Sequence, residues 1–284
     1  GNRVLTFSEM IVDKAIIHNE IKTISKHFLE KNKSAIQIAG SDPQEIKRTI
    51  NILNRIDIIK HVNFNLGCPS SRVQENMLGL ALTQNYDLVK KCLFELINYK
   101  HEVSVKCRLG LGMTEDKNYI FSYLNLFKDI GIKKVFIHCR NGVLNLDTKK
   151  NRTIPQINYE LFLECSNKFP KLELIPNGEV NDLETFNSFK SKNINKYMIG
   201  RQFAKDALFL EKLKLEKIND KTSLVFNSIK ELENYKYLNI NLLKKSLYTL
   251  INNISNSKSI KKDISIIENT KDLLNYIERK IIWT

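Results

Sequence analysis

The chain has 284 residues, 42% of them hydrophobic, which is enough for one large α/β domain with a small appendage. No run of about eighteen uncharged apolar residues occurs, so the sequence excludes a membrane-spanning helix of ordinary length. The formal net charge of +14 favours a polyanionic partner, although the abundance of Lys, Asn and Ile is equally compatible with biased coding.

Apolar runs alternate with helical patterns along most of the chain. The strand-like segments are 4–10, 35–39, 61–65, 103–109, 134–140, 172–177 and 196–200. The helical patterns cover 21–31, 43–59, 87–99, 118–130, 159–169 and 182–191, and a further one begins at 206. This strict βα order predicts a parallel α/β fold, and the length suits a TIM (β/α)8 barrel with one strand absent from the sequence.

After about residue 221 the strand pattern stops. Helical patterns over 242–251, 259–267 and 271–282 predict a small all-helical domain. We therefore expect a barrel domain at 1–220 and a helical domain at 221–284.

The cysteines and histidines give no metal or disulfide signature. The five cysteines contain no CxxC pair, and the five histidines form neither HExxH nor HxH. This pattern argues against zinc and for a reducing compartment, so we expect no metal site. Cys92, Cys107, Cys139 and Cys165 are expected to be buried packing residues.

Cys68 differs from the other cysteines because it follows a strand in a Gly67-Cys68-Pro69 turn. The glycine permits unusual backbone angles and the proline restrains its own φ. In parallel α/β proteins such loops carry the reactive groups. A buried structural cysteine is the alternative for this turn taken alone.

Polar residues gather at the carboxyl ends of the other predicted strands. They are Gln37, Asn63, Asn65, Lys106, Arg108, His138, Arg140, Asn177, Gly178, Glu179, Gly200 and Arg201. Gly178 and Gly200-Arg201 follow the last two strands, where glycine N–H groups and a cation favour phosphate binding over ordinary turns. Lys106 and His138 would add positive or hydrogen-bonding groups, although a lone inward lysine is often only part of a core ion pair.

Several of these segments together resemble the tRNA-dihydrouridine synthases. The matching segments are 37–43, 63–73, 105–108, 138–140, 177–178 and 200–201, and the segment 146–155 resembles a loop of the bacterial A-type subfamily. The resemblance implies a barrel that binds FMN, NADPH as reductant, a helical domain that binds tRNA, and D-loop uridines as the target. It also implies that Cys68 is the general acid that protonates the pyrimidine.

The resemblance assigns further residues to ligands. FMN would contact Gln37, Lys106, His138, Asn177, Gly178, Glu179, Gly200 and Arg201. The substrate nucleotide and tRNA would contact Asn65, Arg140, Lys149, Arg152, Lys258 and Lys261. We expect a monomer in the cytoplasm or in an organelle with its own tRNA.

The cationic helix can also be argued from spacing. Lys258, Lys261 and Lys262 are spaced i, i+3 and i+4, and the window 244–262, which also holds Lys244 and Lys245, contains no acid. Such a face suits phosphates, while a merely solvated face is the alternative.

The sequence departs from the family pattern at three places. The family's first strand, with its Ala-Pro-Met segment, has no counterpart here. Glu179 stands where glycine is common, which brings a carboxylate near the expected phosphate. Asn253, Ser255 and Asn256 replace a Gly-Pro-Gly turn, which could survive because Asn tolerates left-handed angles.

Two other functions remain open from the sequence. The chain could be a catalytically impaired homologue that only binds tRNA. It could also be an FMN barrel oxidoreductase of a small metabolite, against which the basic helical tail argues.

Overall fold

The computed structural model describes residues 4–20, 23–24, 34–206, 209, 213, 226–227, 230, 240–251 and 254–281. The chain divides into two compact units, Gly1–Glu179 with Lys196–Met198, and Val180–Asn195 with Ile199–Thr284. The predicted domain boundary at 220/221 lies outside the described residues. So do most of the helix predicted over 21–31 and most of the one predicted from 206 onwards.

The first unit is built on a six-stranded parallel sheet in the order β1-β2-β3-β4-β5-β6. The strands are β1 Thr6–Val12, β2 Ser34–Ala39, β3 His61–Leu66, β4 Glu102–Arg108, β5 Lys134–His138 and β6 Glu173–Asn177. Each strand pairs in parallel with the next along the chain. This α/β architecture is consistent with the predicted barrel, and six of the seven predicted strands are confirmed.

The seventh predicted strand, at 196–200, is wrong for the described residues. This segment makes only a single parallel bridge, between Met198 and Asn177. Met198 donates its N–H to the carbonyl of Pro176 at 2.9 Å. Pro176 faces this segment but has no N–H to return, so the ladder cannot extend as it does between the other strands.

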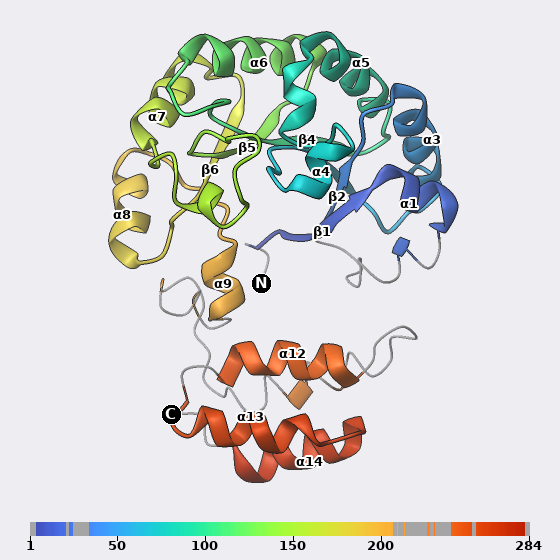
Figure 1. Ribbon diagram of the computed structural model, residues 1–284, viewed down its shortest axis with the longest axis vertical. Coiled ribbons are helices and arrows are strands. Elements are labelled where there is room, and N and C mark those ends of the chain that lie inside the picture. The colour runs from blue at the N-terminus through green and yellow to red at the C-terminus, as the bar shows by residue number, and fades with distance from the viewer. Residues whose placement is uncertain are drawn as a thin grey trace. The chain divides into compact units, whose positions relative to one another are not determined.

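Helices cover the outer side of the curved sheet. Their bounds in this unit are α1 Asp13–His18, α3 Pro43–Leu53, α4 Ser71–Glu75, α5 Tyr86–Leu96, α6 Lys117–Ile130 and α7 Tyr159–Lys168, with short 3-10 turns at Ala81–Gln84 and Lys150–Arg152. Figure 1 shows α3, α5, α6 and α7 in an arc around the strands. These four were predicted, whereas α1 and α4 were not, because neither is long enough to show helical periodicity.

Helix caps fix where the covering helices begin. The Asp42 carboxylate accepts the N–H of Gln44 at 2.7 Å and starts α3, with Pro43 at the first helical position as the sequence indicated. The Asp116 carboxylate accepts the N–H of Asn118 at 2.9 Å and starts α6 in the same way.

The four cysteines outside the Cys68 turn are buried, as predicted. Cys107 lies within β4 and Cys139 directly follows β5, while Cys92 and Cys165 lie on α5 and α7. Burial raises the pKa of Cys92, Cys107 and Cys165 to about 12, so these thiols stay protonated at neutral pH.

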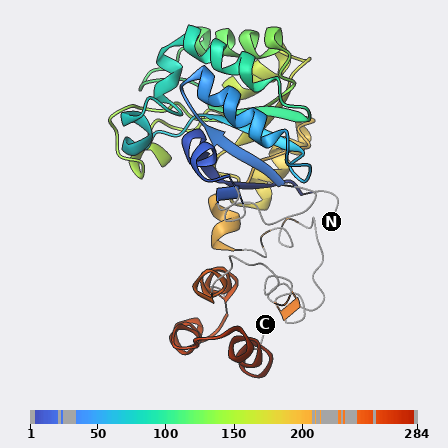
Figure 2. The ribbon, with the colours of Figure 1, turned by 90° about the vertical axis from the view of Figure 1, so that its right-hand side faces the viewer.

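The second unit contains α8 Leu183–Ser191, α9 Arg201–Lys205, α12 Ile240–Leu250, α13 Ser257–Ser265 and α14 Thr270–Lys280. The last three confirm the predicted C-terminal helices and share a core that includes Leu247, Ile264 and Ile277. Figure 2 shows these three helices nearly end-on. Asn256 takes the left-handed conformation, φ 62°, at the turn before α13, as its sequence position allowed. Among the described residues no helix is long and apolar enough to cross a membrane.

Candidate active site

The Cys68 turn is held by the side chain of Asn65 at the end of β3. Asn65 Oδ1 accepts the backbone N–H groups of Gly67 and Cys68, each at 3.0 Å. The carbonyl of Cys68 in turn accepts the N–H of Leu80 at 3.1 Å. Cys68 is half-buried on the loop between β3 and α4, so its thiol lies at the carboxyl edge of the sheet as predicted.

A series of buried, hydrogen-bonded amide side chains holds Asn65 in place. Asn65 Nδ2 donates to Gln37 Oε1, and Gln37 Nε2 donates to Asn63 Oδ1, both at 2.8 Å. Asn63 Nδ2 then donates to Ser104 Oγ at 2.8 Å, which also contacts His61 Nε2 at 2.6 Å. The three amides are at least nine-tenths buried, so this network fixes their orientation.

Lys106 lies beside Asn65, its register partner in the parallel ladder of β3 and β4. Burial, and then the neighbouring charge of Arg108, lower the pKa of the Lys106 ammonium to about 8. A negative charge on Cys68 would raise this pKa, which places the thiol near the ammonium. Within the described part of the chain, no carboxylate lies within ion-pair distance of Lys106. Among the residues that the structure describes, Lys106 thus has no carboxylate partner of its own.

His138 and Gly178 lie in van der Waals contact at the ends of β5 and β6. A Cβ at residue 178 would come within 2.7 Å of His138 Cδ2, and Gly178 has φ 116°, so only glycine fits. The neighbouring Asn177 is committed to the fold, because its Nδ2 donates to the carbonyl of Met198 at 2.7 Å. The imidazole of His138 and the backbone of Gly178 thus lie side by side at the carboxyl edge of the sheet.

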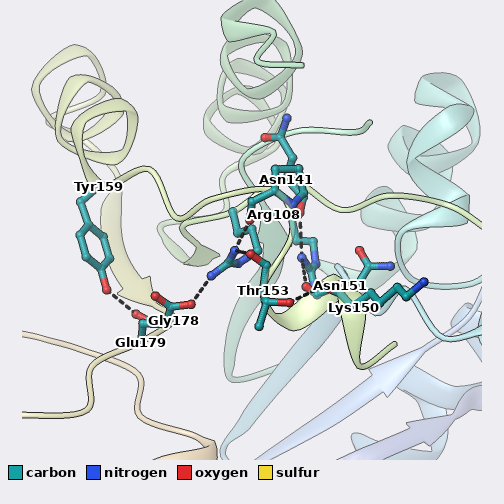
Figure 3. Close-up of polar contacts among 10 residues, drawn as sticks. Arg108, Asn141, Lys150, Asn151, Thr153, Tyr159, Gly178 and Glu179 are labelled. Carbon is teal, nitrogen blue, oxygen red and sulfur yellow. Dashed lines mark hydrogen bonds and ion pairs between the residues drawn. The ribbon is translucent and has the colours of Figure 1, made fainter. Parts of the chain in front are cut away.

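Two buried arginines hold the segment 141–155, which follows β5. Arg108 donates to the carbonyls of Gly67 and Asn141, each at 2.9 Å, and to that of Asn151 at 3.3 Å. Arg140 donates to the carbonyls of Thr153 and Pro155 and forms an ion pair with Glu179. Figure 3 shows Arg108 reaching Asn141 and Asn151, with the Glu179 carboxylate on the side nearer Tyr159.

Asn151 forms the centre of this segment. It is fully buried, accepts the N–H of Val143 at 2.9 Å and donates to the carbonyls of Val143 and Leu146. The residues on either side, Lys150 and Arg152, are exposed. The segment is therefore a folded loop with a polar core and a cationic outer surface.

The predicted residues differ in how they are presented. Lys149 and Arg152 are exposed on the folded loop. Arg140 is only 1% exposed and its guanidinium holds the loop and Glu179, so its tRNA contact stays a prediction with little surface to support it. Glu179, with φ 51°, directs its carboxylate to Arg140.

Gly200 and Arg201 belong to the second unit, where Arg201 is the first residue of α9. Their part in phosphate binding stays a prediction.

The cationic surface of the second unit lies on α13. Lys258 and Lys262 are exposed and Lys261 is half-buried, while Ile260 and Ile264 face the core, which confirms one basic helix face. Lys244 is not part of it, because its ammonium is buried and donates to the carbonyl of Ser265 at 2.8 Å, at the carboxyl end of α13.

Sequence reasoning missed three positioning residues. Arg108 was placed at a strand end without a role, Asn151 was included only as part of the segment 146–155, and Gln74 was not considered. Their contacts are to backbone atoms, and those of Arg108 and one of those of Gln74 reach distant segments; Gln74 Oε1, for example, accepts the N–H of Asn145 at 3.0 Å. No group of His, Cys, Asp and Glu that could hold a metal occurs among the residues described.

Comparison with known proteins points to one family. A family model described as dihydrouridine synthase matches residues 1–280. A tRNA-dihydrouridine(20/20a) synthase of Pasteurella multocida is 30% identical over 204 residues, which is 71% of this chain and 62% of that relative. The synthase of the same name from Pseudomonas putida is 27% identical over 204 residues, 71% of this chain and 60% of the relative. The one from Yersinia pestis is 28% identical over 234 residues, 81% of this chain and 67% of the relative. This chain thus spans less than two thirds of the first two relatives.

Proposed function

Since the chain belongs to the dihydrouridine synthase family, we propose that it reduces uridine to 5,6-dihydrouridine in the D-loop of tRNA. The electrons come from NADPH, with FMN as the bound cofactor. The carbon–carbon double bond of uracil gains a hydride at one carbon and a proton at the other, while NADPH is oxidised. The observation that carries the proposal is the Cys68 thiol, held by Asn65 at the edge of the sheet beside Lys106.

The residues at this edge fit a flavin phosphate and ring. Lys106 offers an ammonium to an anion, and the close contact of Gly178 with the His138 ring places a glycine backbone beside an imidazole at the same edge. Gln37 lies on the strand next to that of Asn63, and its side-chain amide is held in place by the hydrogen bond to Asn63. We propose that these residues, with the backbone of Asn177 and Glu179, whose side chains are bonded elsewhere, hold FMN, which when bound would supply the hydride.

The chain's own chemistry is proton delivery and positioning. Cys68 carries a proton on Sγ that it donates to the pyrimidine carbon opposite the one that is reduced. Asn65 holds the backbone of this turn, and its amide proton not used by Gln37 is the group that would reach the nucleotide. Because a stacked base cannot meet both groups, the uridine is flipped out of the D-loop.

The cationic residues supply the attraction for tRNA. Lys149 and Arg152 on the folded loop, and Lys258 and Lys261 on α13, are proposed to contact phosphates. A tRNA substrate would place the protein in a compartment that contains tRNA.

The test is to purify the protein, add FMN and NADPH, and measure dihydrouridine in unmodified tRNA by mass spectrometry. We expect product that depends on both additions. A protein that binds tRNA but no flavin would be a binding homologue. A flavin protein that oxidises NADPH but leaves tRNA unchanged would be an oxidoreductase of a small metabolite.

A further inference from the structure

A cavity of about 660 Å³ opens beside the Cys68 turn and is not used by the proposed chemistry. It lies between α4, the 3-10 turn Ala81–Gln84 and the segment 144–148 of the folded loop. The residues that matter for its chemistry are Gln74, Glu75, Met77, Gln84, Asn145 and Leu146. Its size is within the range of ligand pockets in proteins.

The wall of this cavity is rigidly connected to the thiol turn. Gln74 Nε2 donates to the carbonyl of Pro69, the residue after Cys68, at 2.6 Å. The other end of the same amide, Oε1, accepts the N–H of Asn145 at 3.0 Å. A ligand in the cavity therefore sits at a fixed place relative to Cys68.

The lining combines apolar surface with amide edges. Met77 is 45% exposed and has φ 54°, a left-handed backbone conformation that a residue with a side chain seldom takes. Gln84 is exposed and offers both a donor and an acceptor, and Glu75 offers acceptors only. A nucleobase has apolar faces and a hydrogen-bonding edge, which is the complement of this lining.

The charges around the cavity suit a sugar–phosphate backbone. Arg72 and Lys149 are exposed and directly adjacent in sequence to residues that line it, and the exposed Lys150 follows Lys149. The Asp147 carboxylate, which also lines it, accepts the backbone N–H groups of Lys149 and Lys150 at 2.7 and 3.2 Å. These N–H groups lower the pKa of Asp147, so the carboxylate stays ionised, and both hydrogen bonds turn its Oδ1 toward its own loop.

We propose that this cavity binds an unstacked nucleobase of the tRNA strand that flanks the target uridine, with adjacent phosphates on Arg72, Lys149 and Lys150. The inference rests on the proposed function and deepens it, because the cavity would set which uridine reaches Cys68. The adenine of NADPH has a similar chemistry and could occupy the same cavity. The experiment below distinguishes a tRNA base from this adenine.

The experiment is a double-mutant cycle between the protein and the RNA. The protein variants are Met77→Asn, which keeps a residue tolerant of left-handed angles, and Gln84→Ala. The RNA variants are tRNAs made abasic at each of the nucleotides next to the target in turn. Dissociation constants are measured without turnover, and dihydrouridine formation is measured separately. Met113→Asn and Gln44→Ala are matched controls, since both residues are exposed and neither lines the cavity.

We expect each cavity variant to bind intact tRNA about tenfold more weakly, the low end for losing contacts with one base. At one abasic position the parent protein should lose about the same factor in tRNA affinity. The cavity variants should lose no further affinity on that RNA, and the control variants should behave as the parent does. The assignment would be overturned if the variants lost equal affinity on all the RNAs, or if they lost none. It would also be overturned if their KM for NADPH rose while their affinity for tRNA did not change.

The two proposals fail in different ways. A parent protein that binds tRNA with the expected coupling but forms no dihydrouridine refutes the function and leaves the base-binding cavity standing. A parent that forms dihydrouridine without the coupling refutes only the cavity. A parent that binds no tRNA refutes both.

Discussion

Asn65 Oδ1 lies 3.0 Å from the backbone nitrogen of Cys68 and accepts its hydrogen bond. The same oxygen accepts the N–H of Gly67, so one amide side chain shapes the turn that carries the thiol. Because Asn65 is in turn held by Gln37, the position of Cys68 depends on buried amides in two strands.

Replacing Asn65 tests this dependence. In Asn65→Ala two backbone N–H groups lose their acceptor and Gln37 loses its donor, so we expect a loss of about 2–3 kcal/mol in unfolding free energy and slower turnover. Asn65→Asp keeps the acceptor for the turn and should retain more of the turnover. Urea unfolding and dihydrouridine assays on both variants measure this. Equal turnover of Asn65→Ala and the parent protein would show that the turn does not need this amide.

The ion pair of Arg140 with Glu179 gives a second prediction. Arg140 is 1% exposed and also holds the carbonyls of Thr153 and Pro155, so Arg140→Met leaves these acceptors and the carboxylate without their cation. We expect a loss of about 3 kcal/mol in unfolding free energy and faster proteolysis of the folded loop.

Glu179→Gln is the milder partner of that variant. Because the Glu179 side chain is 38% exposed, we expect a loss of only about 1 kcal/mol. If Arg140→Met were no less stable than Glu179→Gln, the arginine would not hold the loop as described.

The order of strands and helices could be predicted from the sequence because hydrophobic periodicity reflects burial directly. The segment 196–200 shows the limit, since its apolar pattern predicts a strand but Pro176 on the neighbouring strand lacks the N–H that the ladder needs. Short helices such as α4 have too few residues for a periodic pattern.

At the site, residues that follow strands could be predicted, because parallel strands bring their carboxyl ends together. The role of Arg108 could not, since its partners are backbone carbonyls of segments distant in sequence. That of Asn151 could not either, because its partners are backbone groups within an irregular loop that shows no periodic pattern. The burial of Arg140 was equally invisible, because nothing in the sequence distinguishes a loop-holding arginine from one that faces RNA.

The lowered pKa of Lys106 predicts that the free energy of unfolding depends on pH. Its pKa in the folded protein is about 8, against 10.5 for an ordinary lysine, so between these values the unfolded chain binds more protons. The free energy of unfolding should therefore rise with pH in this window, by about 1–2 kcal/mol after screening of the half-buried ammonium. Denaturation of the parent and Lys106→Met at the two ends of the window measures it.

The Lys106→Met variant should lack that rise, and Lys91→Met, which removes an exposed lysine, should keep it. Affinity for FMN should fall above pH 8 in the parent only, because the ammonium loses its charge there. A rise of the same size in Lys106→Met would assign the effect to another group.

The basic face of α13 predicts the salt dependence of tRNA binding. Lys258→Ala combined with Lys261→Ala removes two phosphate contacts. The plot of log association constant against log salt concentration should therefore become less steep, by about 1.5 in slope. Lys271→Ala combined with Lys280→Ala removes two exposed lysines of α14 as the control. An unchanged slope in the first pair would remove α13 from the RNA interface.

The role of Cys68 is tested most directly by a single turnover of Cys68→Ala. The variant and the parent protein, each loaded with FMN and reduced by NADPH, are mixed with unmodified tRNA, and dihydrouridine is counted over time. The account predicts unchanged flavin content and tRNA affinity, and a product-forming rate at least about a hundredfold lower, because only the proton donor is lost. Dihydrouridine formed by Cys68→Ala at the rate of the parent protein would contradict it.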